Sequence, residues 1–222
     1  MNLRKSLGYY FWASYQRKLL DTAQEKHKAI YYGTVLDVGG RDRGKFNKPK
    51  NTVDRWIFAD ICPDHKPDIV LDVANMPMIE TESIDVITAI QVFAHVERLN
   101  QGLSECFRVL KKNGVLVFSS HLIYPIVNDP DDYRRYTASG WKIELEKHGF
   151  RIETTEVLGR YFTTMADFIT IANKSMPPGI RHIGYLLYPI LSLITRLDDT
   201  SFVTNNKILS SFTTGYFIIA KK

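Results

Sequence analysis

The chain has 222 residues, of which 45% are apolar and 24% charged, and its net charge at pH 7 is +5. These values suit one large globular domain with an elaboration, and the lack of any long basic run argues against a nucleic-acid-binding protein. Cys62 and Cys106 give neither a disulfide framework nor metal-ligand spacing, and the six histidines are scattered. We therefore expect no bound metal and a reducing, cytoplasmic location.

Residues 6–29 are predicted to form a helix. Apolar side chains recur there every four residues, at Leu7, Phe11, Tyr15 and Leu19. This spacing places them on one face. Two roles remain open. The favoured one is a helix that covers the sheet or a ligand cleft, and the other is a basic amphipathic segment that contacts a membrane.

Residues 34–44, TVLDVGGRDRG, predict a buried parallel strand followed by a ligand-binding loop. An apolar run ends at the glycine pair Gly39 and Gly40, where the missing Cβ atoms let a ligand approach the backbone closely. Asp37, near the end of the strand, can orient the loop or meet a positive ligand group. Only residues 41–55 separate this loop from the next strand, so the first helix should be short or irregular.

Further strands are expected at residues 56–59, 68–71, 84–90 and 114–119. The first of these ends in Asp60, 21 residues after Gly39, which is the position for an acid that accepts both hydroxyls of a ribose. The next ends in Asp72. Together with Asp37, these acids would line one edge of the sheet.

The motifs VLDVGG, FADI, DIVLDVANMP, SIDVITAIQVFAHV and LSECFRVLKKNGVLVFSS cover roughly residues 30–120 in this order. In this the chain resembles the class I S-adenosylmethionine-dependent methyltransferases, especially those that act on small molecules, lipids and sugars. A nicotinamide dehydrogenase fits less well, because the G-x-G-x-x-G motif is not intact.

The resemblance implies that S-adenosylmethionine is the cofactor. The glycine pair would face its methionine part, Asp60 would bind the ribose, and Asp72 would meet the adenine. The full set of implied cofactor-binding residues is Asp37, Gly39, Gly40, Asp60, Ile61, Asp72, Val73 and Gln91. Arg41 stands where the family usually has another glycine.

Residues 99–111 predict a helix that Asn113 and Gly114 end. His95 lies just beyond the fourth strand, and we favour a packed or capping role for it over that of a general base. The long loop after the fifth strand contains DYRRYT at residues 132–137, which is similar to a run in methyltransferases encoded with glycan and lipopolysaccharide assembly enzymes.

That loop supplies the candidate catalytic residues. His121 could accept a proton from the acceptor, Asp132 could orient its imidazole, and Arg134 or Arg135 could hold an anionic acceptor group. The alternative is that Asp132 and Arg134 pair with each other and order the loop, while His121 only hydrogen-bonds it.

Thr137 is predicted to cap a helix that ends near residue 147, and strands should follow at residues 150–157 and 213–220. In the family the last strand lies antiparallel beside the sixth. The apolar run at residues 183–195 is too short to span a membrane. It would form a lid or a subunit contact in a homo-oligomer, or, as the less favoured alternative, a membrane-contacting patch.

We therefore predict a Rossmann-like α/β fold with a doubly wound, mostly parallel, seven-stranded sheet. The single methyltransferase domain, residues 1–222, would comprise an N-terminal helix (1–30), a cofactor-binding core (31–157), a helical insertion (158–211) and the last strand (212–222). The predicted activity is methylation of a small or glycan-linked acceptor, with surface polysaccharide biosynthesis as one setting. The alternatives are a lipid or isoprenoid methyltransferase, and a non-catalytic member of the fold that acts as a binding partner.

Overall fold

The computed structural model describes residues 3–41 and 44–222, and for residues 3–7 only the backbone. Asp42 and Arg43 of the predicted glycine loop, and the Leu7 side chain of the predicted helix face, lie outside the described residues. In the part that is described, no helix is both long enough and apolar enough to cross a membrane.

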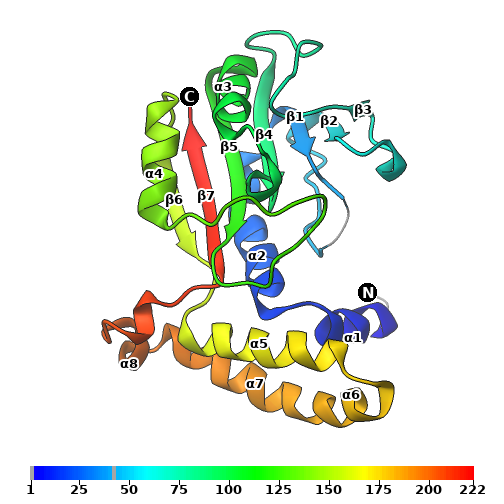
Figure 1. Cartoon of the computed structure of the whole chain (residues 1–222). Coiled ribbons are helices and arrows are strands. Elements are labelled where there is room, and N and C mark those ends of the chain that lie inside the picture. The colour runs from blue at the N-terminus through cyan, green and yellow to red at the C-terminus, as the bar shows by residue number, and fades with distance from the viewer. Residues whose placement is uncertain (1–2, 42–43) are drawn as a thin grey trace.

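A single seven-stranded sheet forms the centre of the molecule (Figure 1). Its strands are β1 (Gly33–Val38), β2 (Val53–Asp60), β3 (Ile69–Val70), β4 (Ile84–Ile90), β5 (Leu110–His121), β6 (Arg151–Val157) and β7 (Gly215–Lys221). Their order is β3-β2-β1-β4-β5-β7-β6, and β7 runs antiparallel to both of its neighbours. The predicted doubly wound, mostly parallel α/β fold is confirmed, with the last strand beside the sixth as expected.

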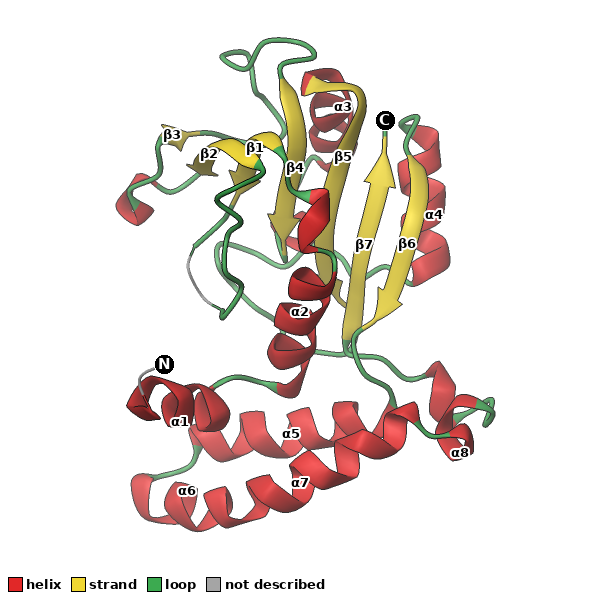
Figure 2. Ribbon diagram, turned by 180° about the vertical axis from the view of Figure 1, so that it is seen from behind, coloured by secondary structure: helices red, strands yellow, loops and turns green. Residues whose placement is uncertain are grey.

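The helices form two groups. They are α1 (Leu3–Trp12), α2 (Tyr15–Lys26), α3 (Leu99–Val109), α4 (Ala138–Lys147), α5 (Tyr161–Ser175), α6 (Pro178–Gly184), α7 (Tyr188–Ile194) and α8 (Ser201–Thr204). Helices α3 and α4 cover one face of the sheet and α2 covers the other, as Figure 2 shows from behind. Helices α1 and α5–α7 form a separate layer beyond the carboxyl ends of the parallel strands.

The predicted single helix at residues 6–29 is wrong, because the chain forms α1 and α2 with a break between them. Ser14 adopts an extended conformation there, and its hydroxyl accepts a hydrogen bond from the backbone N–H of Arg17. This cap starts a new helix with a new direction. As a result Leu20 is buried in α2, together with the predicted Tyr15, whereas the predicted Leu19 is exposed.

No helix connects β1 to β2 in the described residues 39–41 and 44–52, whereas the length predicted a short or irregular one. The sheet face over this connection is instead covered by α2 and by aromatic rings. The buried ring of Tyr31 lies 5.2 Å from that of Phe46 and 5.6 Å from that of Trp56. The N-terminal helix thus occupies a layer that a crossover helix usually fills.

The boundary between α3 and β5 also differs from the prediction. Leu110 is already extended, so α3 ends at Val109, and Asn113 lies inside β5 with a φ of 65°. The pairing of β5 with β4 shifts register at this point. Asn113 and Gly114 therefore form an irregularity within a strand rather than the end of a helix.

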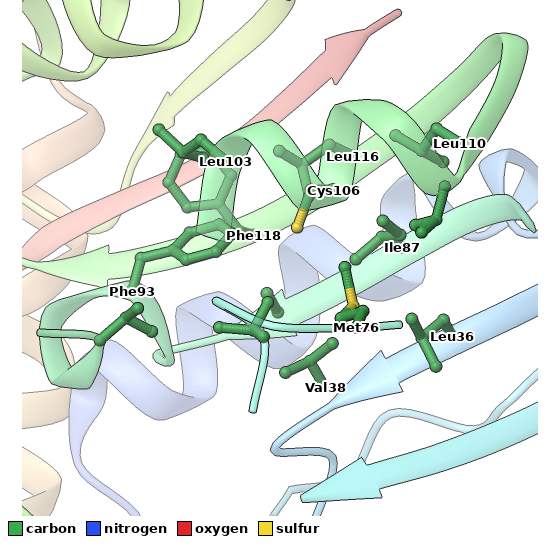
Figure 3. Packing of buried hydrophobic residues seen from close by; sticks show 14 of the residues in the cluster. Leu36, Val38, Met76, Ile87, Phe93, Leu103, Cys106, Leu110, Leu116 and Phe118 are labelled. Atoms are coloured by element: carbon green, nitrogen blue, oxygen red, sulfur yellow. The ribbon is translucent and has the colours of Figure 1, made fainter. Parts of the chain in front are cut away.

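Aromatic and aliphatic side chains from α3, β5 and α4 meet in the larger hydrophobic core. Figure 3 shows Leu103 and Cys106 of α3 directed at the strands, close to Phe118. The Phe118 ring is fully buried and lies edge-on to the rings of Phe93 and Trp141, at 5.2 and 4.9 Å. This cluster anchors the end of β5 from which the long loop at residues 122–137 departs.

Replacing Phe118 with alanine should leave a cavity in this cluster and lower the free energy of unfolding by about 3–5 kcal/mol. Urea unfolding followed by circular dichroism measures this. Ile126 is a matched control, because it is apolar and exposed, and Ile126→Ala should change stability by no more than about 0.5 kcal/mol. Equal effects of the two substitutions would contradict the packing described here.

Candidate active site

A cavity of about 770 Å³ opens at the carboxyl ends of β1, β2 and β4, which is where doubly wound folds bind ligands. Its volume lies within the range of small-molecule and cofactor sites. The predicted site residues that line it are Asp37, Gly39, Gly40, Asp60, Ile61, Asp72, Val73, Gln91 and His121. The sheet topology thus brings together residues that are up to 84 positions apart in the sequence.

The glycine loop is built around the buried carboxylate of Asp37. One of its oxygens accepts a hydrogen bond from Trp56 Nε1 at 2.7 Å and lies 3.3 Å from Lys48 Nζ. A Cβ atom at Gly40 would sit 2.0–2.2 Å from this carboxyl group, so a side chain there would displace it. The absence of a side chain at Gly40 therefore leaves room for the Asp37 carboxylate as well as for a ligand. Gly39 adopts a φ of 64°, which turns the chain.

Asp60 ends β2 and is buried at the cavity wall. Its Oδ1 accepts a hydrogen bond from the backbone N–H of Cys62 at 2.9 Å, and its Oδ2 lies 3.1 Å from His65 Nδ1. A carboxylate can accept about four hydrogen bonds. Asp60 thus keeps acceptor capacity for a pair of hydroxyl groups, while the exposed Ile61 side chain offers an apolar surface beside it.

The third acid, Asp72, follows β3. Its carboxylate accepts from the backbone N–H of Ala74 and from Arg98 Nη2, both at 2.8 Å. These bonds fix the turn that presents Val73 to the cavity. The arrangement provides one apolar side chain and one oriented carboxylate, a combination that suits a flat base with amino groups at its edge.

Gln91, just after β4, adopts a φ of 61° and turns its side chain into the cavity. Its Oε1 accepts a hydrogen bond from Arg17 Nη2 at 2.8 Å. Arg17 belongs to α2 and also lines the cavity, 74 residues away in the sequence. Arg17 is not among the residues predicted from the sequence, since nothing in the pattern of α2 distinguishes a cavity-facing arginine from a solvated one.

Arg41, the departure from the family glycine, ties three loops together at the cavity wall. Its Nη1 lies 3.0 Å from His65 Nε2, and its Nη2 donates to Asp129 Oδ2 at 2.8 Å. The glycine loop, the β2–β3 connection and the loop after β5 are thereby joined. Arg41 thus takes on a bridging role that a glycine could not perform.

His121 lies at the end of β5 and is buried, with its ring stacked on that of Tyr124 at 4.1 Å. Its Nδ1 has no hydrogen-bond partner within the described part of the chain. Burial, helped by the positive charges of Arg135 and Arg17, lowers the pKa of His121 to about 3. The imidazole is neutral at pH 7, but such an acidic conjugate acid makes it a weak proton acceptor.

The predicted roles of Asp132 and Arg134 are wrong. The Asp132 carboxylate pairs with Arg135 and accepts from the backbone N–H of Val127, so it does not orient His121. The Arg134 guanidinium donates hydrogen bonds to backbone carbonyls, among them those of Val96 and Glu97. The contacts of both side chains order the loop after β5, and neither side chain lines the described cavity. The alternative of a direct Asp132–Arg134 pair is not formed either.

His95 lines the cavity, although the sequence favoured a packed role. Its Nδ1 lies 2.6 Å from the carbonyl oxygen of Asp131. Because a carbonyl only accepts, Nδ1 carries the proton and Nε2 is left as an acceptor when the ring is neutral. The geometry of a general base is therefore present at His95 rather than at His121.

Comparison with known proteins places this geometry among methyltransferases. Residues 45–118 match the family model described as a methyltransferase domain. The structure is similar to that of an S-adenosylmethionine-dependent methyltransferase from Archaeoglobus fulgidus, with a TM-score of 0.60 and 21% identity over 100% of both chains. A putative methyltransferase from Bacillus halodurans C-125 has a TM-score of 0.55 and 18% identity over 91% of this chain and 98% of its own.

The [4+2]-cyclase SpnF shares the fold as well, with a TM-score of 0.57 and 18% identity over 96% of this chain and 83% of its own. No curated protein matches the chain in sequence. The fold is thus that of S-adenosylmethionine-dependent methyltransferases, as the motifs predicted, and S-adenosylmethionine is the cofactor that the family match and the fold imply.

Asp60→Ala should weaken S-adenosylmethionine binding about ten- to a hundredfold, because hydrogen bonds to a charged group contribute about 1.5–3 kcal/mol. Isothermal titration calorimetry measures this. Asp64→Ala is the matched control, since Asp64 is an exposed acid four residues further on and lies outside the described cavity lining. Unchanged affinity in a folded Asp60→Ala protein would remove the ribose assignment.

His121 should make stability fall at mildly acidic pH. The unfolded chain binds a proton at His121 with a pKa of about 6.5 and the folded protein only near 3, so the stabilisation is complete above pH 6.5. It is lost as the pH falls from there, by about 1.4 kcal/mol per pH unit.

Urea unfolding of wild type and of His121→Asn at several pH values between about 7 and 5 isolates this contribution. The stability difference between the two proteins should shrink as the pH falls. Parallel pH curves for wild type and variant would show that His121 is not held neutral by burial.

Proposed function

We propose that this chain, a class I S-adenosylmethionine-dependent methyltransferase by its fold and its methyltransferase-domain match, methylates a polar small-molecule or glycan-linked acceptor. One observation carries the proposal. The strand-end acids and the loop at residues 127–133 line the same cavity, so a cofactor site and a polar acceptor site are contiguous. We expect the reaction to take place in the cytoplasm, because both cysteines are free thiols.

The cavity fits the cofactor. Gly40 leaves room for the buried Asp37 carboxylate at the cavity wall, and the buried carboxylate of Asp60 keeps acceptor capacity. Asp60 would hold the ribose, and Asp72 with Val73 would hold the adenine. Arg17, beside Gln91, would supply a planar cation for the carboxylate of the methionine part. When bound, S-adenosylmethionine supplies an electrophilic methyl group on a positively charged sulfur.

The acceptor side of the cavity is polar. Tyr133, Asp129, Arg41 and His95 face it from the loops after β1, β4 and β5. Hydroxyl-rich molecules are recognised by such a mixture of donors, acceptors and an aromatic ring. The similarity of residues 132–137 to methyltransferases of glycan assembly supports a sugar-linked acceptor in surface polysaccharide synthesis.

The chain would contribute to the reaction mainly by positioning the acceptor in line with the reactive methyl group. A hydroxyl acceptor must also lose its proton. His95 Nε2 is the acceptor for that proton, since the Asp131 carbonyl holds the opposite nitrogen in the protonated form. His121 lines the cavity and stacks on Tyr124.

Two other functions share these observations. A lipid or isoprenoid methyltransferase would use the same cofactor contacts, and a non-catalytic member of the fold would bind the cofactor without turnover. The [4+2]-cyclase among the similar structures illustrates that the fold by itself does not determine the reaction. Release of S-adenosylhomocysteine in the presence of a glycan or lipid acceptor separates these cases.

His95→Gln should lower methyl transfer by about two to four decades while S-adenosylmethionine affinity stays unchanged, because only the proton acceptor is lost. The assay is transfer of labelled methyl groups to a glycolipid or sugar-nucleotide extract. His148→Gln is a close control, because His148 Nδ1 also contacts a backbone carbonyl, that of Glu144 at 2.8 Å, on α4. If His95→Gln is fully active but His121→Gln is not, the base is His121.

A further inference from the structure

Helices α6 and α7 continue one another through a 3₁₀ turn, and together with the 3₁₀ turn after them they form a rod that is the outermost layer of the molecule (Figures 1 and 2). One side of this rod is packed: Tyr188 and Leu191 are buried, and the Phe11 ring of α1 lies 4.9 Å from that of Tyr185. The rod is therefore firmly attached to α1 and α5.

The opposite side of the rod is apolar and exposed. We call it the apolar stripe, and it consists of Ile180, Ile183, Leu186, Leu187, Ile190, Leu193 and Leu197. At 3.6 residues per turn these positions span an arc of roughly 140°. Leu186 and Leu193 are 75% and 64% exposed. A contiguous apolar surface of this kind is a site of interaction.

The charges around the apolar stripe are mostly positive. Between Asp167 and Asp198 the sequence contains Lys174, Arg181 and Arg196 and no carboxylate. The two bounding acids are buried, Asp198 by accepting hydrogen bonds from backbone N–H groups at the start of α5. Asp199, the last residue of the rod, is an exposed carboxylate, and Arg160 Nη1 lies 4.0 Å from it. Lys174, Arg181 and Arg196 therefore leave the exposed charge of this layer mostly positive.

An aromatic side chain adjoins the same layer. Trp12, at the end of α1, is 78% exposed, and the ammonium of Lys174 lies 5.9 Å from its ring centroid. Tryptophan and lysine side chains are favoured at the boundary between lipid headgroups and water. The rod and α1 thus share the features of an interfacial membrane-binding surface.

We propose that the apolar stripe docks on a bilayer that contains anionic lipids. The lysine and arginines would attract phosphate headgroups, and the leucines and isoleucines would enter the acyl boundary. Charge complementarity favours this occupant over a second copy of the chain, because a symmetric dimer would bring these cations into opposition. Docking by itself depends on no step of methyl transfer.

For the proposed function, docking specifies the acceptor as a lipid-linked molecule. The rod lies on the side of the sheet at which the cavity opens. The Asp167 carboxylate of α5 accepts hydrogen bonds from the backbone N–H groups of Tyr15 and Gln16 at the start of α2. The next residue, Arg17, lines the cavity. A docked protein would thus hold its cavity near the headgroups. This consequence rests on the proposed function, whereas the docking does not.

Vesicle flotation of the full chain tests the docking, with vesicles of phosphatidylcholine alone and of phosphatidylcholine mixed with phosphatidylglycerol. We expect binding to the anionic vesicles, weakened in roughly 1 M salt, where the Debye length is about 3 Å. The double variant Leu186→Glu/Leu193→Glu should bind at least about tenfold more weakly. Both residues are exposed, so the variant should fold, which circular dichroism and S-adenosylmethionine binding verify.

Ile143→Glu is the control, since Ile143 is 65% exposed on α4, away from the rod, and this variant should bind vesicles like wild type. Failure of wild type to bind anionic vesicles, or equal binding by the double variant, overturns the proposal. So does sedimentation that shows a dimer dissociated by the double variant, which would assign the apolar stripe to a second copy. Loss of vesicle binding by the double variant with unchanged methyl transfer to a glycolipid in the same vesicles would keep the docking and reject only the lipid-linked acceptor.

Discussion

The buried carboxylate of Asp167 connects the two layers of this protein. It accepts hydrogen bonds from the backbone N–H groups of Tyr15 and Gln16, at 2.6 and 3.0 Å, where the positive end of the α2 dipole lies. Burial raises its pKa to about 6 in spite of these donors. Gln16 in turn donates through Nε2 to the carbonyl of Thr214, just before β7. Since α2 covers a sheet face over which the described residues 39–41 and 44–52 form no crossover helix, this contact helps to place Arg17 in the cavity.

Much of the sheet could be predicted from the sequence because its strands are apolar runs with clear ends. Residues 84–90 form β4 at the predicted bounds, and the acids that follow β2 and β3 reach the same edge because parallel strands point the same way. The break at Ser14 could not be predicted, since the residue that completes the start of α2 is Asp167, some 150 positions away. The irregularity at Asn113 depends in the same way on pairing with β4.

Site residues at the ends of strands could be predicted from their position in the sequence. The roles of residues that depend on hydrogen-bond partners or neighbouring charges from other parts of the chain could not. Asp60 and Asp72 line the cavity as expected. An arginine such as Arg134 can bind either an anion or backbone carbonyls, and the sequence does not distinguish the two. Only the fold shows that three carbonyls on either side of His95 lie within hydrogen-bonding distance of Arg134. The depressed pKa of His121 likewise arises from burial and neighbouring cations, which its place after an apolar strand does not reveal.

The position of β7 has a consequence for biosynthesis. This strand pairs with β5 on one side and β6 on the other, yet the ribosome makes it after both. Until residues 215–221 emerge, a nascent chain exposes two unpaired strand edges, and the insertion before β7 delays closure by a time on the order of seconds. Open edges of this kind recruit other chains. Shielding of the open edges of β5 and β6 during this interval would therefore favour native pairing with β7 over association with other chains.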